Sequence, residues 1–155
     1  MEEKRHRVLF QQLEDYRQET LKAIDGLTDE DVNLIPDSFS NNILWNLGHI
    51  YLDQYLWIAH LTKETIPLSP GFNEWFNFGT KPADWDTPPP KLAVLVSLLQ
   101  EQPQKIQAAY KDRLEEEFPA TESGMHTIAQ VLVRTIFHEA LHLASINTIR
   151  RFLGK

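Results

Sequence analysis

The sequence predicts an all-α protein, a bundle of four helices forming one domain over residues 1–155. Three observations lead to this expectation. Apolar residues recur at helical spacing in four long segments, stretches rich in proline, glycine and aspartate separate these segments, and no segment alternates like a strand. Amphipathic helices in a short chain bury their apolar faces by packing against one another, so we expect an antiparallel four-helix bundle.

The first helix is expected from about Glu3 to Ile24, where apolar residues recur every three or four positions. It should end at Gly26, because glycine suits a left-handed cap. The segment Thr28–Asp31 is typical of a short capped turn. A second helix should begin near Ser40 or Asn41, both good N-caps, and continue to about residue 61.

A long irregular stretch is expected between residues 62 and 90, where prolines and glycines interrupt the helical pattern. Connections of this length are usually functional or packed over the rest of the fold. The aromatic residues of this connection favour packing. They are Phe72, Trp75, Phe76, Phe78 and Trp85.

The third helix should start after the prolines at 88–90 and run to about Glu117, since proline suits a first helical turn. Pro103 lies inside it and should kink or break it. The fourth helix is expected from about Met125 to Leu153, before Gly154. Its expected inward stripe contains Ile128, Val131, Leu132, Thr135, His138, Leu141, His142, Ser145, Ile146 and Ile149.

Composition excludes several classes of protein. The formal net charge of −7 disfavours nucleic-acid binding as a main role. No apolar run is long enough to span a bilayer and no signal segment follows the N-terminus, so we expect a cytoplasmic protein without a membrane partner. The absence of cysteine excludes disulfides, thiolate ligands and a cysteine nucleophile, and leaves histidine and carboxylate as metal ligands.

Two histidines, His138 and His142, are four residues apart and therefore lie on one face of the fourth helix. This spacing lets two imidazoles bind one ion at about 2.0–2.1 Å from each nitrogen. The face is otherwise apolar, and a histidine in a bundle core needs a hydrogen-bond partner or a metal. The alternative without a metal is that the two histidines are ordinary core or surface residues that have this spacing by chance.

The same segment also reads His-Glu-x-x-His, the motif of zinc proteases, with Glu139 in the position of the general base. Such enzymes place the motif in a larger domain with a sheet and a peptide cleft, and this sequence indicates neither a sheet nor such a cleft. Glu139 is rotated ~100° from the stripe of His138, so we expect it on a solvated face.

His49 is the expected third ligand, because it lies in the middle of the second helix on a stripe with Trp45 and Asp53. Gly48 beside it suits the close approach of a neighbouring helix. His60, three turns further on, is a reserve candidate, although a position near the helix end explains it better. The two remaining histidines, His6 and His126, are expected at the surface.

Three protein nitrogens with open coordination positions are typical of a catalytic metal rather than a structural one. Asp53, one turn from His49, is the candidate catalytic residue: it would orient an imidazole or act as a general base, unless it is a plain surface carboxylate. Four aromatic residues would either roof an apolar pocket or pack in the core, and they are Trp45, Trp75, Phe76 and Trp85. For Trp45 we expect packing in the core.

The segments Asn42–Ile50 (NILWNLGHI) and His138–Ile146 (HEALHLASI), followed by Arg150 and Arg151, make this chain similar to the DinB-like superfamily, which includes YfiT-like metal-dependent hydrolases. The order of elements resembles that family along almost the whole chain. A helix is followed by a helix with a histidine, a long aromatic connection, another helix, and a helix with His-x-x-x-His.

The resemblance implies a four-helix bundle, commonly a dimer, with nickel, zinc or another divalent ion on three histidines that correspond to His49, His138 and His142. Members of the family include thiol S-transferases and a maleylpyruvate isomerase that use bacillithiol, mycothiol or glutathione. The family often has glycine and then glutamine after the histidine pair, where this chain has Ala144 and Ser145. Ser145 is expected to alter what reaches the metal.

We therefore expect a divalent-metal-dependent thiol S-transferase or hydrolase that acts on a small molecule and forms a homodimer. A low-molecular-weight thiol would be the co-substrate of the transferase. The alternative is a non-catalytic bundle, either with a structural metal or as a metal-binding stress-response protein. The two hypotheses differ in whether a coordination position of the metal is open.

Overall fold

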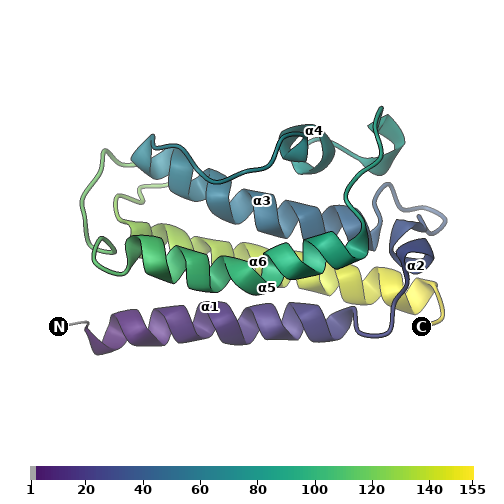
Figure 1. Cartoon of the computed structure of the whole chain (residues 1–155), viewed down its shortest axis with the longest axis horizontal. Helices are drawn as coiled ribbons and strands as arrows, with labels where there is room; N and C mark the ends of the chain where they lie inside the picture. The colour runs from purple at the N-terminus through teal and green to yellow at the C-terminus, as the bar shows by residue number, and fades with distance from the viewer. Residues whose placement is uncertain (1–2) are drawn as a thin grey trace.

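The computed structural model describes residues 3–155 and is all-helical, as the sequence predicts (Figure 1). The elements are α1 (Lys4–Ala23), α2 (Asp29–Asn33), α3 (Ile43–Thr62), α4 (Phe72–Phe76), the 3-10 turn η1 (Pro82–Asp84), α5 (Leu92–Tyr110) and α6 (Ile128–Phe152). Within the described residues, β-type pairing is limited to one bridge between Glu117 and Thr127. No helix in residues 3–155 combines the length and the apolar character that a membrane crossing requires.

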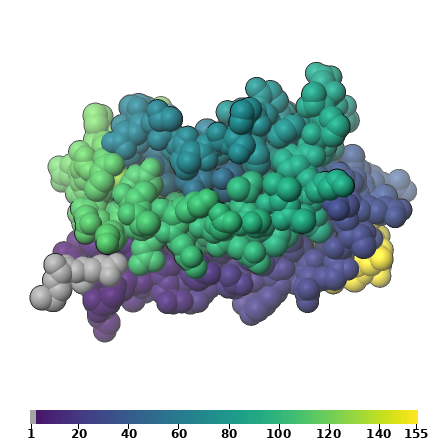
Figure 2. Space-filling model, in the orientation of Figure 1, coloured from purple at the N-terminus to yellow at the C-terminus, as the bar shows by residue number. Residues whose placement is uncertain are grey.

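The four long helices lie side by side, with α1 and α6 running in one direction and α3 and α5 in the other (Figure 1). α6 packs against α3 and α1, and α5 packs against α1 and α3. In the face seen in Figure 2, α5 crosses the middle, α1 lies along the lower edge, and the teal upper part belongs to the end of α3 and the α3–α5 connection. The connection between α3 and α5 returns along the bundle, so these two helices run in the same direction. The pair α3 and α6 is antiparallel, which places the middle of α3 beside the middle of α6.

Side-chain caps define where α3 and α6 begin. Asn42 Oδ1 accepts a hydrogen bond from the backbone of Trp45 over 2.8 Å, so the N-cap of α3 is Asn42 and not Ser40 or Asn41. Thr127 forms a capping box at the start of α6. These caps fix the ends of the two helices that carry the candidate site.

α5 continues through Pro103 and ends at Tyr110 instead of near Glu117. Proline has no N–H, so the carbonyl of Leu99, four residues earlier, loses its helical donor. Arg17 Nη1 donates to that carbonyl over 2.7 Å. The guanidinium of α1 thus replaces the missing donor, and the helix is not broken.

The same arginine joins α1 to α6 and α3 in the core. Arg17 Nε donates to Glu139 Oε1 over 2.8 Å, and Arg17 Nη2 donates to Gln54 Oε1 over 3.1 Å. The Thr20 hydroxyl donates to the same Glu139 oxygen over 2.9 Å. Glu139 is 5% exposed, so the expectation that it lies on a solvated face is wrong. Its burial depends on an opposite charge that α1 supplies, which spacing along α6 does not reveal.

The inward face of α6 differs from the expected stripe at two further positions. Leu141 is 53% exposed, and Ser145 is exposed as well. The helices that contact α6, chiefly α3 and α1, cover only part of its circumference. The arc that they cover carries His138 and His142, which are half-buried.

The connection between α3 and α5 folds over α3 through α4 (Figure 1). Phe76 of α4 is fully buried, and a Cβ on Gly48 of α3 would lie only 2.4 Å from its ring. Glycine therefore permits this close approach, although the neighbour is α4 and not one of the long helices. Trp85 Nε1 donates to the carbonyl of Trp75 over 2.8 Å and ties the connection to itself. The segment thus reaches α3 at the turn that carries His49.

Candidate metal centre

Three histidine side chains from α3 and α6 meet in the structure. His49 lies on α3, and His138 and His142 lie one turn apart on α6. One ring nitrogen of each residue lies within 4.8 Å of the corresponding nitrogens of the other two. The Nε2 atoms of His49 and His138 are 3.2 Å apart. The three residues singled out from the sequence as metal ligands are therefore brought together, although they are separated by up to 93 positions along the chain (142 − 49).

The donor set fits a divalent transition-metal ion. Two nitrogens that share one ion at about 2.0–2.1 Å lie about 2.8–3.4 Å apart for bond angles between 90° and 109°. The separation of 3.2 Å between His49 Nε2 and His138 Nε2 falls in this range. Imidazole nitrogens without thiolate or extra carboxylate ligands suit zinc, nickel and similar ions.

The opposite nitrogen of each ring faces an oxygen atom. His49 Nδ1 is 2.7 Å from the carbonyl oxygen of Phe76, and His142 Nδ1 is 2.8 Å from Asn46 Oδ1. His138 Nδ1 is 3.0 Å from Asp53 Oδ2. Hydrogen-bond acceptors at Nδ1 of His49 and His142 favour the tautomer with hydrogen on Nδ1, and the negative charge of the Asp53 carboxylate beside His138 Nδ1 favours the same tautomer there. This tautomer directs each Nε2 lone pair toward the centre of the cluster.

Asp53 holds its position beside His138 without a regular hydrogen bond to the ring. The 3.0 Å contact between His138 Nδ1 and Asp53 Oδ2 is short, but Oδ2 has no hydrogen-bond partner among the described residues. A side-chain hydrogen bond from Trp57 also reaches the carboxyl group. Burial raises the pKa of Asp53 above its ordinary value. The residue is thus a half-buried carboxylate next to a ligand ring, and not a plain surface carboxylate.

Burial also keeps the imidazoles on α6 neutral. It lowers the pKa of His138 to about 3, with further lowering by the neighbouring rings of His142 and His49. Burial and the proximity of His49 lower the pKa of His142 to about 4. A metal ligand must be deprotonated, so both rings are ready to bind a cation at neutral pH.

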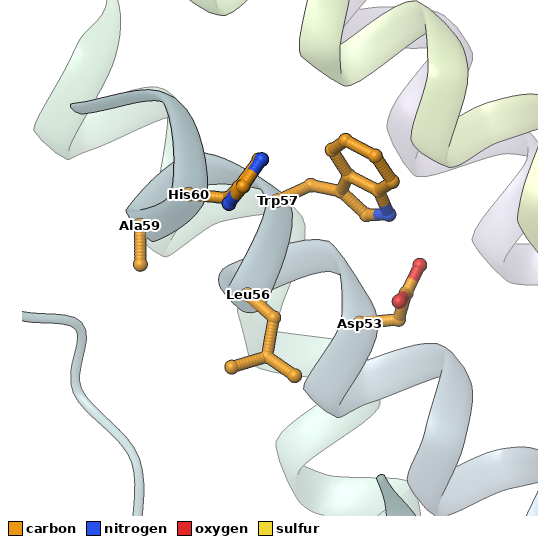
Figure 3. A pocket seen from close by; sticks show the side chains of 5 residues that line it. All are labelled: Asp53, Leu56, Trp57, Ala59 and His60. Atoms are coloured by element: carbon orange, nitrogen blue, oxygen red, sulfur yellow. The ribbon is translucent and has the colours of Figure 1, made fainter. Parts of the chain in front are cut away.

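A pocket of about 490 Å³ opens beside Asp53 along α3. It is lined by Asp53, Leu56, Trp57, Ala59 and His60. Asp53 and Trp57 point to the same side of α3, with the indole nitrogen toward the carboxylate, whereas Leu56 and Ala59 point the other way (Figure 3). The lining is largely apolar and contains one carboxylate, which contacts ligand candidate His138. An apolar small molecule in this pocket would lie beside the cluster.

A cation from α6 covers the indole of this pocket. The guanidinium carbon of Arg134 lies 4.2 Å from the centre of the Trp57 ring. Arg134 is one turn before His138, so it shares the face of α6 that carries the cluster. Stacking of this kind holds the indole in place by cation–π attraction.

The other histidines do not join the cluster. His60 Nε2 is 2.8 Å from Glu122 Oε2 near the end of α3, away from the three rings. His126 is only partly exposed, although it was expected at the surface. His6 was expected at the surface but is only 9% exposed, because its Nε2 bonds to Glu115 Oε1 over 2.8 Å. The partner lies after α5, so no local pattern around His6 indicates its burial.

Two neighbours of the cluster went unnoticed in the sequence. Asn46 lies three residues before His49 and thus on nearly the same face of α3, a signal that could have been used. Phe76 contributes its backbone carbonyl, for which side-chain identity gives no signal. Trp45, expected in the core, is 6% exposed and stacks on the His49 ring at 4.6 Å between centroids. Its Nε1 donates to Thr80 Oγ1 over 2.9 Å, so the α3–α5 connection also holds this indole.

Glu139 does not act beside the cluster as a zinc-protease base would. Its carboxylate oxygens accept hydrogen bonds from Arg17 and Thr20 of α1, at 2.8 and 2.9 Å to Oε1 and 3.2 Å to Oε2. A carboxylate held by a guanidinium in the core is not positioned to take a proton from water at the three rings. The literal His-Glu-x-x-His motif is therefore not accompanied by the geometry of that class.

Comparison with known proteins agrees with this arrangement. The family model described as the DinB superfamily matches residues 12–146, which include α3, α6 and all three histidines. Among curated proteins, none matches the chain. The family match covers most of the sequence, and the chain belongs to the DinB superfamily.

Proposed function

We propose that this protein is a divalent-metal-dependent enzyme, a thiol S-transferase or a hydrolase, that acts on a small molecule. The observation that carries the proposal is the convergence of His49, His138 and His142, each with its Nδ1 facing an oxygen atom. Three protein ligands leave coordination positions for substrate or water, which is typical of catalytic sites. Nickel or zinc is the ion we expect.

The three imidazoles would hold the ion, which supplies Lewis acidity toward a water, a thiol or a carbonyl oxygen. Phe76, Asn46 and Asp53 would keep the rings in place, because each offers an oxygen to one Nδ1. The raised pKa of Asp53 favours uptake of a proton, so we assign it the role of general base toward a substrate in the neighbouring pocket.

The origin of the thiol follows from composition. The chain has no cysteine, so a transferred sulfur must come from a second, low-molecular-weight substrate. The pocket beside Asp53, about 490 Å³ in volume, is of the size that holds a small molecule. We propose that the four long helices act as the rigid frame of this site, as a single-domain homodimer in the cytoplasm.

The test compares metal content and turnover in matched variants. Elemental analysis of the purified wild type should give one divalent ion per chain, and His138→Ala should lose it. His126→Ala is the matched control, because it removes a partly exposed imidazole outside the cluster and should keep the metal. Absence of metal from the wild type would refute the site.

Activity is then screened with metal-loaded protein. Electrophiles are offered together with low-molecular-weight thiols, and esters and amides are offered alone. Turnover that is lost in His138→Ala and kept in His126→Ala supports the enzyme. A fully loaded protein that turns over none of these compounds supports the non-catalytic, metal-binding alternative instead.

A further inference from the structure

The outer face of α6 differs in composition from an ordinary exposed helix surface. α3 and α1 pack against the inner side of this helix, and nine positions between residues 130 and 148 remain exposed. None of these nine described positions carries a charged residue, although 24% of the residues in the chain are charged. The centre of the face is formed by Val133, Phe137, Ala140, Leu141, Ala144 and Thr148.

Three large apolar side chains project from this face. Val133, Phe137 and Leu141 are 58%, 64% and 53% exposed, and they follow one another at intervals of four residues. Together they expose on the order of 300 Å² of apolar surface, the size at which such patches mark interaction sites. A solvated helix surface normally carries charged residues, and a helix that is apolar on its outer side as well is normally covered there too. A partner is therefore expected on this face.

We propose that this face of α6 binds the same face of a second copy of the chain, in an antiparallel pair of α6 helices related by a two-fold axis. The inference deepens the proposed function by assigning the surface of the homodimer, and it rests on that function for the expectation of two copies. A two-fold contact uses the same patch on both copies, so the patch must be complementary to itself.

The spacing of large and small side chains provides this complementarity. With the two-fold axis between Ala140 and Leu141, Phe137 faces Ala144 of the second copy, and Leu141 faces Ala140 of the second copy. Each large side chain thus meets a small one, which allows the two helices to approach closely. Outward positions also recur at alternating intervals of three and four residues from Gln130 onward, and all of them are exposed as far as residue 147. This pattern is typical of the seam between two packed helices.

Charge and size both favour a second copy as the partner. The chain has a net charge of −7, so two copies repel each other wherever charged surfaces meet, and the uncharged face of α6 offers a contact without this repulsion. A partner recognised by its charge would find no opposite charge on the face. From residue 130 to residue 147 the seam is about 27 Å long, and a helix is about 10 Å wide. The pair therefore buries on the order of 1,000 Å², at the low end of specific interfaces, and we expect a dissociation constant in the micromolar range.

Sedimentation velocity of matched variants tests the surface. The wild type should sediment as a dimer, at twice the 18.0 kDa of one chain. Ala144→Glu would place a carboxylate against Phe137 of the second copy at two equivalent positions, and it should raise the dissociation constant about a hundredfold. Ala108→Glu on α5 is the matched control, because it introduces the same charge at another exposed alanine and should leave the dimer intact.

Cross-linking through single cysteines tests the register of the two helices. The chain has no cysteine, so an introduced cysteine can form a disulfide only with its equivalent in a second copy. Ala140→Cys lies beside the proposed axis and should give a covalent dimer under mild oxidation, since a disulfide needs Cα atoms within about 7 Å. Gln130→Cys on the same exposed face is the control, because its two equivalents would lie about 30 Å apart along the pair.

The outcomes separate this inference from the proposed metal centre. A dimer that dissociates in Ala144→Glu, persists in Ala108→Glu and cross-links through position 140 but not 130 supports the proposed surface. A dimer that Ala144→Glu leaves intact overturns it, and cross-linking through position 130 overturns the antiparallel register. A wild type that is monomeric at about 100 μM also overturns the inference and leaves the face to a different partner. The zinc content of the same proteins tests the centre independently: one ion per chain in a monomer leaves the centre standing, and a dimer without zinc refutes the centre alone.

Discussion

Replacement of Gly48 by alanine tests whether α4 holds the candidate centre in place. The added Cβ would lie 2.4 Å from two ring carbons of Phe76 and 2.5 Å from a third. Carbon atoms in contact normally stay about 3.5–4.0 Å apart, so the ring or α3 must shift by roughly 1 Å. The ring cannot turn toward solvent, because Phe76 is fully buried and packs against Phe72 and Trp85 at 5.5 and 5.9 Å.

Two opposing effects determine the free energy of unfolding of Gly48→Ala. Alanine in a helix interior is more favourable than glycine by about 1 kcal/mol. Overpacking of a core costs about 1–3 kcal/mol. The net expectation is a loss of up to about 2 kcal/mol, and a shift of α4 should also stretch the 2.7 Å contact between His49 Nδ1 and the Phe76 carbonyl. Loss of such a partner lowers metal affinity about tenfold to a hundredfold.

The assay combines urea denaturation with zinc competition against a chelator. The double variant Gly48→Ala with Phe76→Leu should be less destabilised than the sum of its single variants, because the smaller side chain relieves the overlap. A Gly48→Ala protein that is more stable than the wild type and binds zinc equally well would refute the reasoning. So would strict additivity in the double variant.

Three further predictions concern the charges around the cluster. Arg17→Met should lower the free energy of unfolding, measured by urea denaturation, by about 3–5 kcal/mol, because it leaves Glu139 buried without its counter-ion. The double variant with Glu139→Leu should regain most of this stability. A double variant as unstable as the single one would contradict the account. The metal-free protein should lose stability as the pH falls from about 6.5 toward 4. In this range the imidazoles of His138 and His142 bind protons in the unfolded chain but stay neutral in the folded protein, where their pKa values are about 3 and 4. Above pH 6.5 this contribution is fully present, and urea midpoints of a variant with glutamine at both positions should show a shallower slope; an identical slope would contradict it. Asp53→Asn should lower zinc affinity about tenfold to a hundredfold in chelator competition while far-UV circular dichroism stays unchanged, and equal affinity would remove Asp53 from the site.

The parts of the site that could be predicted from sequence are those with a local signal. His138 and His142 share a helix face because of their spacing, and His49 was found because α3 shows a long apolar pattern around it. Asp53 follows His49 by one turn, and it lies 3.0 Å from a ring, although the ring is that of His138. Antiparallel packing of α3 on α6 explains this shift, because the turn after His49 on α3 lies beside the turn before His142 on α6.

The features that sequence reasoning missed depend on contacts between distant segments. Glu139 is buried only because Arg17 of α1 reaches it, and His6 only because Glu115 does. The carbonyl of Phe76 contacts His49 because glycine at position 48 lets α4 approach, and a backbone acceptor leaves no trace in side-chain identity. Helical periodicity reports which face is apolar, but it does not report which polar group finds a partner inside.

The core of the bundle and the candidate centre are linked through two adjacent residues of α6. His138 turns toward the three-ring cluster, and Glu139, about 100° further round the helix, turns toward Arg17. Arg17 is itself held by the Leu99 carbonyl, which is free to accept because Pro103 has no N–H. A buried ion pair of this kind contributes little net stability compared with an apolar core, but it tolerates few rotations of the helix that carries it. The proline of α5, the arginine of α1 and the glutamate of α6 therefore set the rotation of α6 at which His138 and His142 face His49. The glutamate of the His-Glu-x-x-His sequence thus serves in this fold to orient the helix, and Asp53 is the residue that we propose for the proton-accepting role.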